Sequence, residues 1–388
     1  MRPPSWTGKV TSLFSAIFAG MCLAAAVSYG GDKADISQPL AGLSGPQLGS
    51  REAGPEEFPR HFRTRDGLGP QFDENSCHSC QDKAGISQSL AGLSGLQLSM
   101  YEAGLEEFER RFRTQDGLGP QFDENSCHSC HRQPSVGGAG PRYRSNFNFA
   151  HGSDLLELEG GPLLQVRAIH REPREIIPAA ATNFSLRKVP PLYGLGLAEA
   201  IPDSQIAAVA ARNGGKSVFT EDGGIQRFGS QNQVASLKRF VTNGFALELG
   251  ITEGENPEIA QSIQNVVSFI RFLAPPPRGE INEDVLLGEQ VFAEIGCADC
   301  HTPAFTTAPG PFTTASGEVV DVAALQNKTI MPYSDFLLHD LGLGLDDGVP
   351  LHGGSSAEYR TIPLWGLRFR KNKLMHDARA ANFRQMLL

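Results

Sequence analysis

The sequence has only seven cysteines in 388 residues and no surplus of positive charge. Lysine and arginine number 34 against 43 aspartate and glutamate residues, which gives a formal net charge of −9. A basic surface of the kind that binds nucleic acid or an anionic membrane is therefore not expected. Apart from residues 10–27, the sequence also lacks an apolar run long enough to cross a bilayer. We expect no nucleic-acid partner and no membrane insertion by the rest of the chain.

The N-terminal residues have the layout of a secretory signal peptide. Arg2 and Lys9 precede the apolar run, which ends in three alanines at residues 24–26 before polar sequence begins. An uncleaved membrane anchor is the alternative, because the run is near the lower limit for a span. The alanines favour cleavage. We predict a signal peptide over residues 1–27 and an exported, periplasm-like location for the mature protein.

Two Cys-x-x-Cys-His motifs are the most informative feature of the remaining chain, at residues 127–131 and 297–301. This spacing is the attachment signature of c-type haem, because two thiols one helical turn apart can each form a thioether to a haem vinyl group. The histidine after the second thiol then lies under the iron as its proximal ligand. The predicted attachment residues are Cys127, Cys130, Cys297 and Cys300, and the predicted iron ligands are His131 and His301.

Structural disulfides and half of a zinc ribbon are the alternative interpretations of these motifs. Neither requires a histidine directly after the second cysteine, and here that histidine occurs twice. The predicted export also brings the chain to an oxidising compartment, where c-type haem is attached. Two covalently bound haem c groups, each with one iron, are therefore the favoured cofactors.

A direct repeat with a period of 50 residues includes the first motif. Residues 32–80 and 82–130 differ at ten of the 49 aligned positions, but the first copy continues into Gln81 where the second has the ligand histidine. Prolines in the first copy would also break the helix that apolar spacing predicts over residues 99–113. We predict that residues 32–81 are a degenerate, poorly ordered segment without haem.

The cysteines of the degenerate copy have several possible states. Cys77 and Cys80 form a local disulfide or stay free. A zinc site built from the four cysteines of the two copies has suitable spacing, but it would sacrifice the first haem site. His78 could ligate a haem, yet His128 occupies the same place in the intact copy, which favours a shared role other than ligation.

A second, more divergent repeat follows the two haem motifs. Arg187-Lys-Val-Pro-Pro-Leu-Tyr-Gly194 and Arg360-Thr-Ile-Pro-Leu-Trp-Gly366 lie at nearly the same distance from the preceding motif histidine. An arginine beside a haem can pair with a propionate carboxylate. Proline and glycine can set a tight turn against the macrocycle. A coincidental turn motif is the alternative.

The two halves are joined by a stiff proline-rich linker at residues 274–277. Helical apolar spacing is present before it, over residues 256–273, and after it, over residues 283–295, where the helix runs directly into the second motif. Strand-like alternation is scarce. We predict a mainly α fold with two cytochrome c-like haem domains and long loops, at residues 82–274 and 280–388.

Four segments resemble one family, the bacterial di-haem oxidoreductases, whose members carry the labels peroxidase or thiol oxidoreductase and are related to di-haem cytochrome c peroxidases. The resemblance extends over about residues 94–388. It is carried by residues 116–131, 190–202, 332–342 and 375–380. Relatives continue past the position of Leu388, so the second domain is expected to be truncated and its haem to have an open sixth position. The thiol-oxidoreductase label has little support, because the motif cysteines are assigned to haem.

Two functions remain compatible with the motifs, the charge and the resemblance. The first is a peroxidase-like oxidoreductase that takes electrons from small soluble electron-transfer proteins and reacts with hydrogen peroxide. The second is a non-catalytic di-haem electron carrier with both irons six-coordinate. His339 is the first choice for a distal ligand, because Asp340 beside it could orient the imidazole. The other candidates, each of which could instead be an ordinary packed or surface residue, are His151, His376, Met331 and Met375.

Overall fold

The structure is a computed structural model that describes residues 85–388 except 141–144, 171, 255, 352, 371–373 and 388. Residues 85–388 belong to one compact unit. The predicted signal peptide and the degenerate segment at 32–81, with Cys77 and Cys80, lie outside the described residues. The division into domains at 82–274 and 280–388 stays a prediction. None of the described helices is long and apolar enough to cross a membrane.

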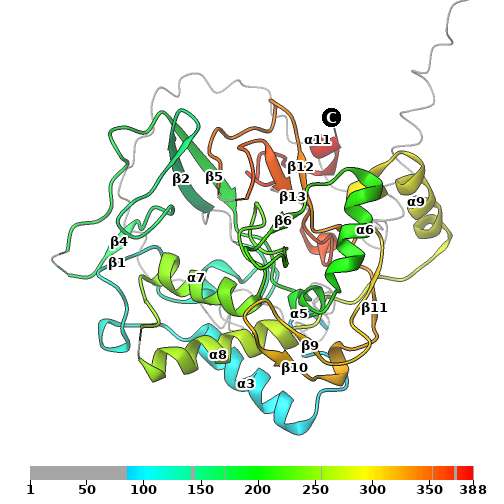
Figure 1. Ribbon diagram of the computed structural model, residues 1–388, viewed down its shortest axis with the longest axis horizontal. Coiled ribbons are helices and arrows are strands. Elements are labelled where there is room, and N and C mark those ends of the chain that lie inside the picture. Colours follow the sequence, from blue (N-terminus) through cyan, green and yellow to red (C-terminus); the bar gives the residue numbers. More distant parts are fainter. Residues whose placement is uncertain are drawn as a thin grey trace, which may run out of the picture. The chain divides into compact units, whose positions relative to one another are not determined.

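The prediction of a mainly α fold is wrong. Helices account for 32% of the described residues and strands for 16%, distributed over several small sheets (Figure 1). The helices in this part of the chain are α3 (Gly95–Glu109), α4 (Cys127–Cys130), α5 (Leu195–Glu199), α6 (Asp203–Asn213), α7 (Leu237–Leu249), α8 (Pro257–Phe272), α9 (Glu283–Glu294), α10 (Cys297–Cys300) and α11 (Phe383–Leu387).

The strands pair antiparallel in one three-stranded sheet, β3-β2-β5, and in five two-stranded sheets, β1-β4, β6-β7, β8-β11, β9-β10 and β12-β13. Their bounds are β1 Gln121–Phe122, β2 Ser145–His151, β3 Asp154–Leu156, β4 Arg167–Ala168, β5 Asn183–Lys188, β6 Val218–Phe219, β7 Ile225–Gln226, β8 Phe305–Thr306, β9 Phe312–Thr313, β10 Val319–Val320, β11 Thr329–Ile330, β12 Leu338–Asp340 and β13 Glu358–Arg360.

Two physical reasons explain why the sequence pattern does not predict these strands. Most are two or three residues long, which is too short for a periodic pattern. In the longer strand β5, polar and apolar residues do alternate, but the polar residues are the buried ones. Ser185 and Arg187 are buried, whereas Phe184 and Leu186 are exposed. A rule that places apolar residues inside therefore reads this strand incorrectly.

The helical predictions agree better with the structure. The predicted helix at 256–273 corresponds to α8, which Asn256 caps and Pro257 opens. The predicted apolar stripe of α8 is buried. The predicted helix at 283–295 corresponds to α9, and the one at 99–113 overlaps α3 but begins earlier, at the capping box of Ser94 and Gln97.

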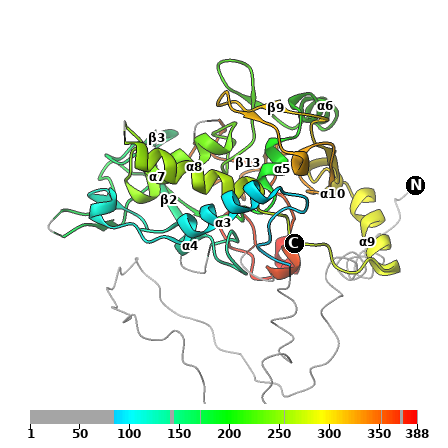
Figure 2. The same cartoon turned by 90° about the horizontal axis from the view of Figure 1, so that it is seen from below.

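Helix α8 is central to the core that supports the first motif. It packs against α3 and α7 (Figure 1). Gly104 of α3 allows a close approach, because a Cβ atom there would lie 2.2 Å from the carbonyl oxygen of Asn265. The ring centroids of Phe108 and Phe269 are 4.8 Å apart at the same interface. The second motif has its own preceding helix, α9, which packs against α10 (Figure 2).

Candidate haem-binding sites

The first Cys-x-x-Cys-His motif forms a single helical turn, α4, which begins after Ser126. The backbone N–H of His131 donates to the carbonyl of Cys127 at 3.0 Å, so the turn closes on the histidine. Cys127 and Cys130 are therefore separated by one turn. The Nδ1 atom of the His131 ring lies 3.2 Å from the carbonyl oxygen of Gly138. When Nδ1 donates this hydrogen bond, the lone pair is on Nε2, which is then the nitrogen that could bind a metal.

The second motif repeats this arrangement. Gly296, with a φ of 85°, precedes the one-turn helix α10. The N–H of His301 donates to the carbonyl of Cys297 at 2.9 Å. The Nδ1 atom of His301 lies 2.8 Å from the carbonyl oxygen of Tyr333, so the lone pair is again on Nε2 when Nδ1 donates.

A phenylalanine from the preceding helix packs beside each histidine. The Phe108 and His131 ring centroids are 6.2 Å apart, and those of Phe292 and His301 are 6.1 Å apart. Phe108 belongs to α3 and Phe292 to α9. Each predicted ligand is thus held by the same set of contacts: a closed turn, a backbone carbonyl at Nδ1 and an aromatic ring from the helix before the motif.

Burial favours the neutral form of both histidines. It lowers the pKa of His131 to about 4, against the opposing effect of hydrogen bonds to the backbone of Gly138 and Pro190. Burial also lowers the pKa of His301, and the hydrogen bond to Tyr333 acts in the opposite direction. Iron is bound by a neutral imidazole, so the protonation state of both rings suits ligation.

The motif thiols are available for the predicted chemistry. Cys127, Cys297 and Cys300 are not in disulfide bonds, so neither motif is closed by a disulfide in this structure. Burial raises the pKa of Cys127 to about 12, which keeps it as a thiol. Across the described residues, no group of three or more His, Cys, Asp or Glu side chains is arranged to hold a metal ion. Paired thiols beside an oriented, neutral imidazole fit a haem c group.

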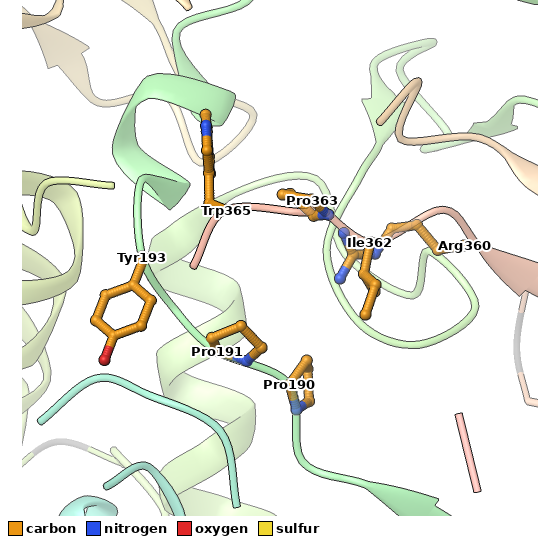
Figure 3. A pocket seen from close by; sticks show the side chains of 7 residues that line it. All are labelled: Pro190, Pro191, Tyr193, Arg360, Ile362, Pro363 and Trp365. Carbon is orange, nitrogen blue, oxygen red and sulfur yellow. The ribbon is translucent and has the colours of Figure 1, made fainter. Parts of the chain in front are cut away.

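The two proline turns meet each other. Gly194, with a φ of 70°, lies against Trp365, and a Cβ atom on Gly194 would come within 2.4 Å of the indole ring. Beside this contact is a small pocket between the two turns (Figure 3). Its lining residues are Pro190, Pro191, Tyr193, Arg360, Ile362, Pro363 and Trp365.

The two arginines of these turns have different partners. Arg187 forms a bidentate ion pair with Asp347, with N–O distances of 2.8 and 2.9 Å, and also donates to the carbonyl of Val349. Arg360 donates through Nε to the carbonyl of Gly229 at 2.7 Å, and its Nη1 atom has no hydrogen-bond partner among the described residues. Sequence alone did not distinguish the two.

His339, the first choice for a distal ligand, has both ring nitrogens in contact with protein atoms. Nε2 lies 2.7 Å from the Oδ2 atom of Asp335, and Nδ1 lies 3.4 Å from the sulfur of Cys300. The hydrogen bond to Asp335 is the largest of the effects that raise the pKa of His339, to about 10. Because both ring nitrogens already have protein partners, this arrangement does not support His339 as a ligand. Its carboxylate partner is Asp335 and not the predicted Asp340.

The other distal candidates are dispersed. His376 stacks on Tyr359, with ring centroids 3.8 Å apart, and neither nitrogen of its ring has a hydrogen-bond partner within the described part of the chain. Met375, beside it, has a φ of 73°. The Met331 sulfur accepts a hydrogen bond from Arg278 at 3.4 Å. His151 is exposed at the end of β2, and its Nδ1 lies 2.8 Å from the Ala180 carbonyl oxygen.

Several residues of the second site are not predicted by the sequence analysis. Asp335 is fully buried and also accepts a hydrogen bond from the side chain of Asn213 at 3.0 Å. Tyr333 contributes its carbonyl oxygen to His301, and its ring packs edge-on against Phe292 with centroids 5.9 Å apart. The spacing of Asp335 and His339, four residues apart, was visible in the sequence, but nothing there shows that both face Cys300.

Residues 229–388 match the family model described as di-haem oxidoreductase, putative peroxidase. The resemblance is confirmed for this segment. It includes the second haem motif and β12, and it does not reach the first motif at 127–131. No curated protein and no solved structure matches the chain at a significant level. The description of the matched family names two haems, and the matched segment contains the second motif.

Proposed function

We propose that this protein is an exported di-haem c-type cytochrome that acts as a peroxidase-like electron-transfer oxidoreductase. The observation that supports this proposal best is the equivalence of the two motifs. Both present a one-turn pair of cysteines and a neutral histidine held through Nδ1 by a backbone carbonyl. The family match covers one of the two, and the same local structure recurs at the other.

Each residue of the motifs has a distinct role in this proposal. Cys127 and Cys130 would bind one haem, and Cys297 and Cys300 the other, each through thioethers formed by addition of the thiol S–H across a vinyl group. His131 and His301 would be the proximal ligands, with Nε2 toward the iron. When bound, haem supplies an iron centre that exchanges single electrons.

The protein environment then determines how strongly each iron is held and how its ligands are protonated. The backbone carbonyls of Gly138 and Tyr333 fix the ring orientations and increase the basicity of the imidazoles. Phe108 and Phe292 pack beside the two rings, with centroids 6.2 and 6.1 Å away. Burial lowers the pKa of both histidines and so favours the neutral rings that bind iron.

The proposal extends to location and partners. The N-terminal charge and apolar pattern supports export to a periplasm-like compartment. The net charge of −9 favours a small basic or neutral electron-transfer protein as the donor. Hydrogen peroxide is the proposed electron acceptor.

Electron paramagnetic resonance of the oxidised protein tests the enzymatic part of this proposal. A peroxidase needs one iron with an open or displaceable sixth position, so we expect one high-spin signal that cyanide converts to low-spin. Two low-spin signals that do not respond to cyanide would contradict a peroxidase and favour a non-catalytic electron carrier.

A further inference from the structure

Tyr333 connects the ligand His301 to helix α9 through two of its groups. Its carbonyl oxygen lies 2.8 Å from Nδ1 of His301. Its phenol donates a hydrogen bond of 2.7 Å to Oε1 of Glu289, which belongs to α9. The ring packs edge-on against Phe292 of the same helix. A single residue therefore joins α9 to the histidine of the second motif.

The backbone of Tyr333 has a conformation that a bulky side chain disfavours. Its φ is 50°, in the left-handed region, where the Cβ atom crowds the carbonyl oxygen. Such a conformation persists when the surrounding contacts hold it in place. Rotation to the usual region would reorient the peptide group whose carbonyl faces His301. The hydrogen bond at the ligand therefore depends on what holds Tyr333.

Backbone hydrogen bonds attach the residues on both sides of Tyr333. The N–H of Ser334 donates to the Thr302 carbonyl at 3.0 Å. The Pro332 carbonyl accepts from the N–H of Leu364 at 2.9 Å. These bonds hold the segment against the second motif, but Tyr333 makes neither of them. The conformation of Tyr333 itself is held by the contacts of its side chain with α9.

The carboxylate of Glu289 is in turn held by a cation. Arg278, directly after the proline-rich linker, forms an ion pair with it. A hydrogen bond to an ionised carboxylate is stronger than one between neutral groups. Burial, together with the hydrogen bond to Glu289, raises the pKa of Tyr333 to about 12. The phenol therefore stays protonated at neutral pH and can donate to Glu289.

The first site has no equivalent of this side-chain contact. The carbonyl at Nδ1 of His131 belongs to Gly138, at 3.2 Å, and glycine has no side chain that could reach a helix. A Cβ atom on Gly138 would lie 2.2 Å from the carbonyl oxygen of Gln133, so a larger residue would not fit without a shift. The two ligand histidines are thus held by hydrogen bonds of different length, and the shorter one is at the second motif.

We propose that Glu289 and Tyr333 are positioning residues, which act through the Tyr333 carbonyl to strengthen the hydrogen bond at Nδ1 of His301. This inference rests on the proposed function, because its effect is measured at the iron that His301 would bind. A stronger hydrogen bond makes the imidazole more basic and so favours oxidised iron. The midpoint potential of the haem at the second motif is therefore lower than it would be without the phenol–carboxylate hydrogen bond.

The first test is Tyr333→Phe, which removes the phenol oxygen, keeps an aromatic ring beside Phe292 and changes no charge. Haem content by pyridine haemochrome and both midpoint potentials by spectroelectrochemistry are measured on the mature full-length protein. We expect two haems, one raised potential and one potential equal to that of the wild type. Two haems with both potentials unchanged, or with both shifted equally, would overturn the inference and leave the proposed function intact. A wild-type protein without covalent haem would refute the proposed function itself.

Variants of Glu289 test the other end of the hydrogen bond. Glu289→Ala removes the acceptor, whereas Glu289→Gln keeps an oxygen acceptor without the charge. Glu294→Ala removes a charge from an exposed position of the same helix and is the matched control. We expect E289A to raise the potential that Y333F raises, and E289Q and E294A to raise it less. Equal shifts in E289A and E294A would assign the effect to charge alone and would overturn the inference.

The double variant Y333F/E289A tests whether the two residues act through one hydrogen bond. If they do, loss of the phenol has no further effect once the acceptor is gone, so the double variant should have the potentials of E289A. A shift equal to the sum of the two single shifts would mean that the residues act independently, and would overturn the inference.

Discussion

At the scale of single residues, a backbone carbonyl lies at the Nδ1 atom of the ligand histidine in each motif, and the lone pair for iron is on Nε2 when Nδ1 donates to it. Gly138 and Tyr333 supply these carbonyls at 3.2 and 2.8 Å from Nδ1. The motifs and the ligands His131 and His301 could be predicted from the sequence because they are contiguous. The two carbonyls could not, since they come from segments that folding brings to the motif.

The first prediction concerns these ligands. His131→Gly and His301→Gly should each remove the proximal ligand of one haem while the thioether cysteines remain, so each should change the absorption and resonance Raman bands of one haem only. His128→Gly is the matched control. His128 is not a predicted ligand, and its Nδ1 atom lies 3.8 Å from Oε1 of Glu109. Both haem spectra should therefore be unchanged in this variant. A single substitution that altered both haems equally would contradict separate sites.

A second prediction uses the ion pair of His339 with Asp335. The hydrogen bond to Asp335 raises the pKa of His339 above 6.5, so the stabilisation by this pair is fully present below pH 6.5 and is lost as pH rises through the raised pKa. His339→Gln should therefore lower the melting temperature most at pH 6 and least near pH 10. Thermal melts of both proteins across this range measure the difference. If the difference in melting temperature between wild type and variant did not depend on pH, the pair would not be ionic.

At the scale of elements, helices were predicted more successfully than strands, for a physical reason. Helix α8 buries a wide apolar stripe, and that stripe has the periodicity of a helix in the sequence. Strand β5 instead turns the guanidinium of Arg187 inward, toward Asp347, and leaves Phe184 exposed. The burial of Arg187 depends on its ion pair with Asp347, which is 160 residues away in the sequence. A local sequence pattern cannot reveal this pair.

A third prediction tests the contact between α3 and α8. Gly104→Ala would place a Cβ atom 2.2 Å from the Asn265 backbone oxygen, so the helices would have to separate. We expect a loss of about 1–3 kcal/mol in the free energy of unfolding, as for other overpacked cores. Gly95→Ala, in the same helix with open space around it, should cause no loss. Chemical denaturation of both variants makes the comparison, and equal stabilities would contradict a tight crossing at Gly104.

At the scale of the whole molecule, the two halves share one local design and differ in their surroundings. The turn of one half contacts the turn of the other through Gly194 and Trp365. The sequence predicted the repeat of these turns. It did not predict that they meet, because such a contact depends on the arrangement of the whole compact unit.

A fourth prediction concerns the duplicated segment at residues 32–81. The intact copy at 82–131 retains the ligand histidine that Gln81 replaces, so deletion of 32–81 should leave haem content and melting temperature unchanged. Pyridine haemochrome and thermal melts compare the deletion variant with the full chain. A marked fall in either quantity would mean that the segment has a structural role.

The most direct test of the whole account is the number of covalently bound haems. Intact-mass analysis of the mature protein, produced with the haem-attachment machinery, should show two haems per chain. Replacing Cys127 and Cys130 by serine should remove one, whereas replacing Cys77 and Cys80 should remove none. A mass with no haem, one haem or three haems in the unsubstituted protein would contradict the account.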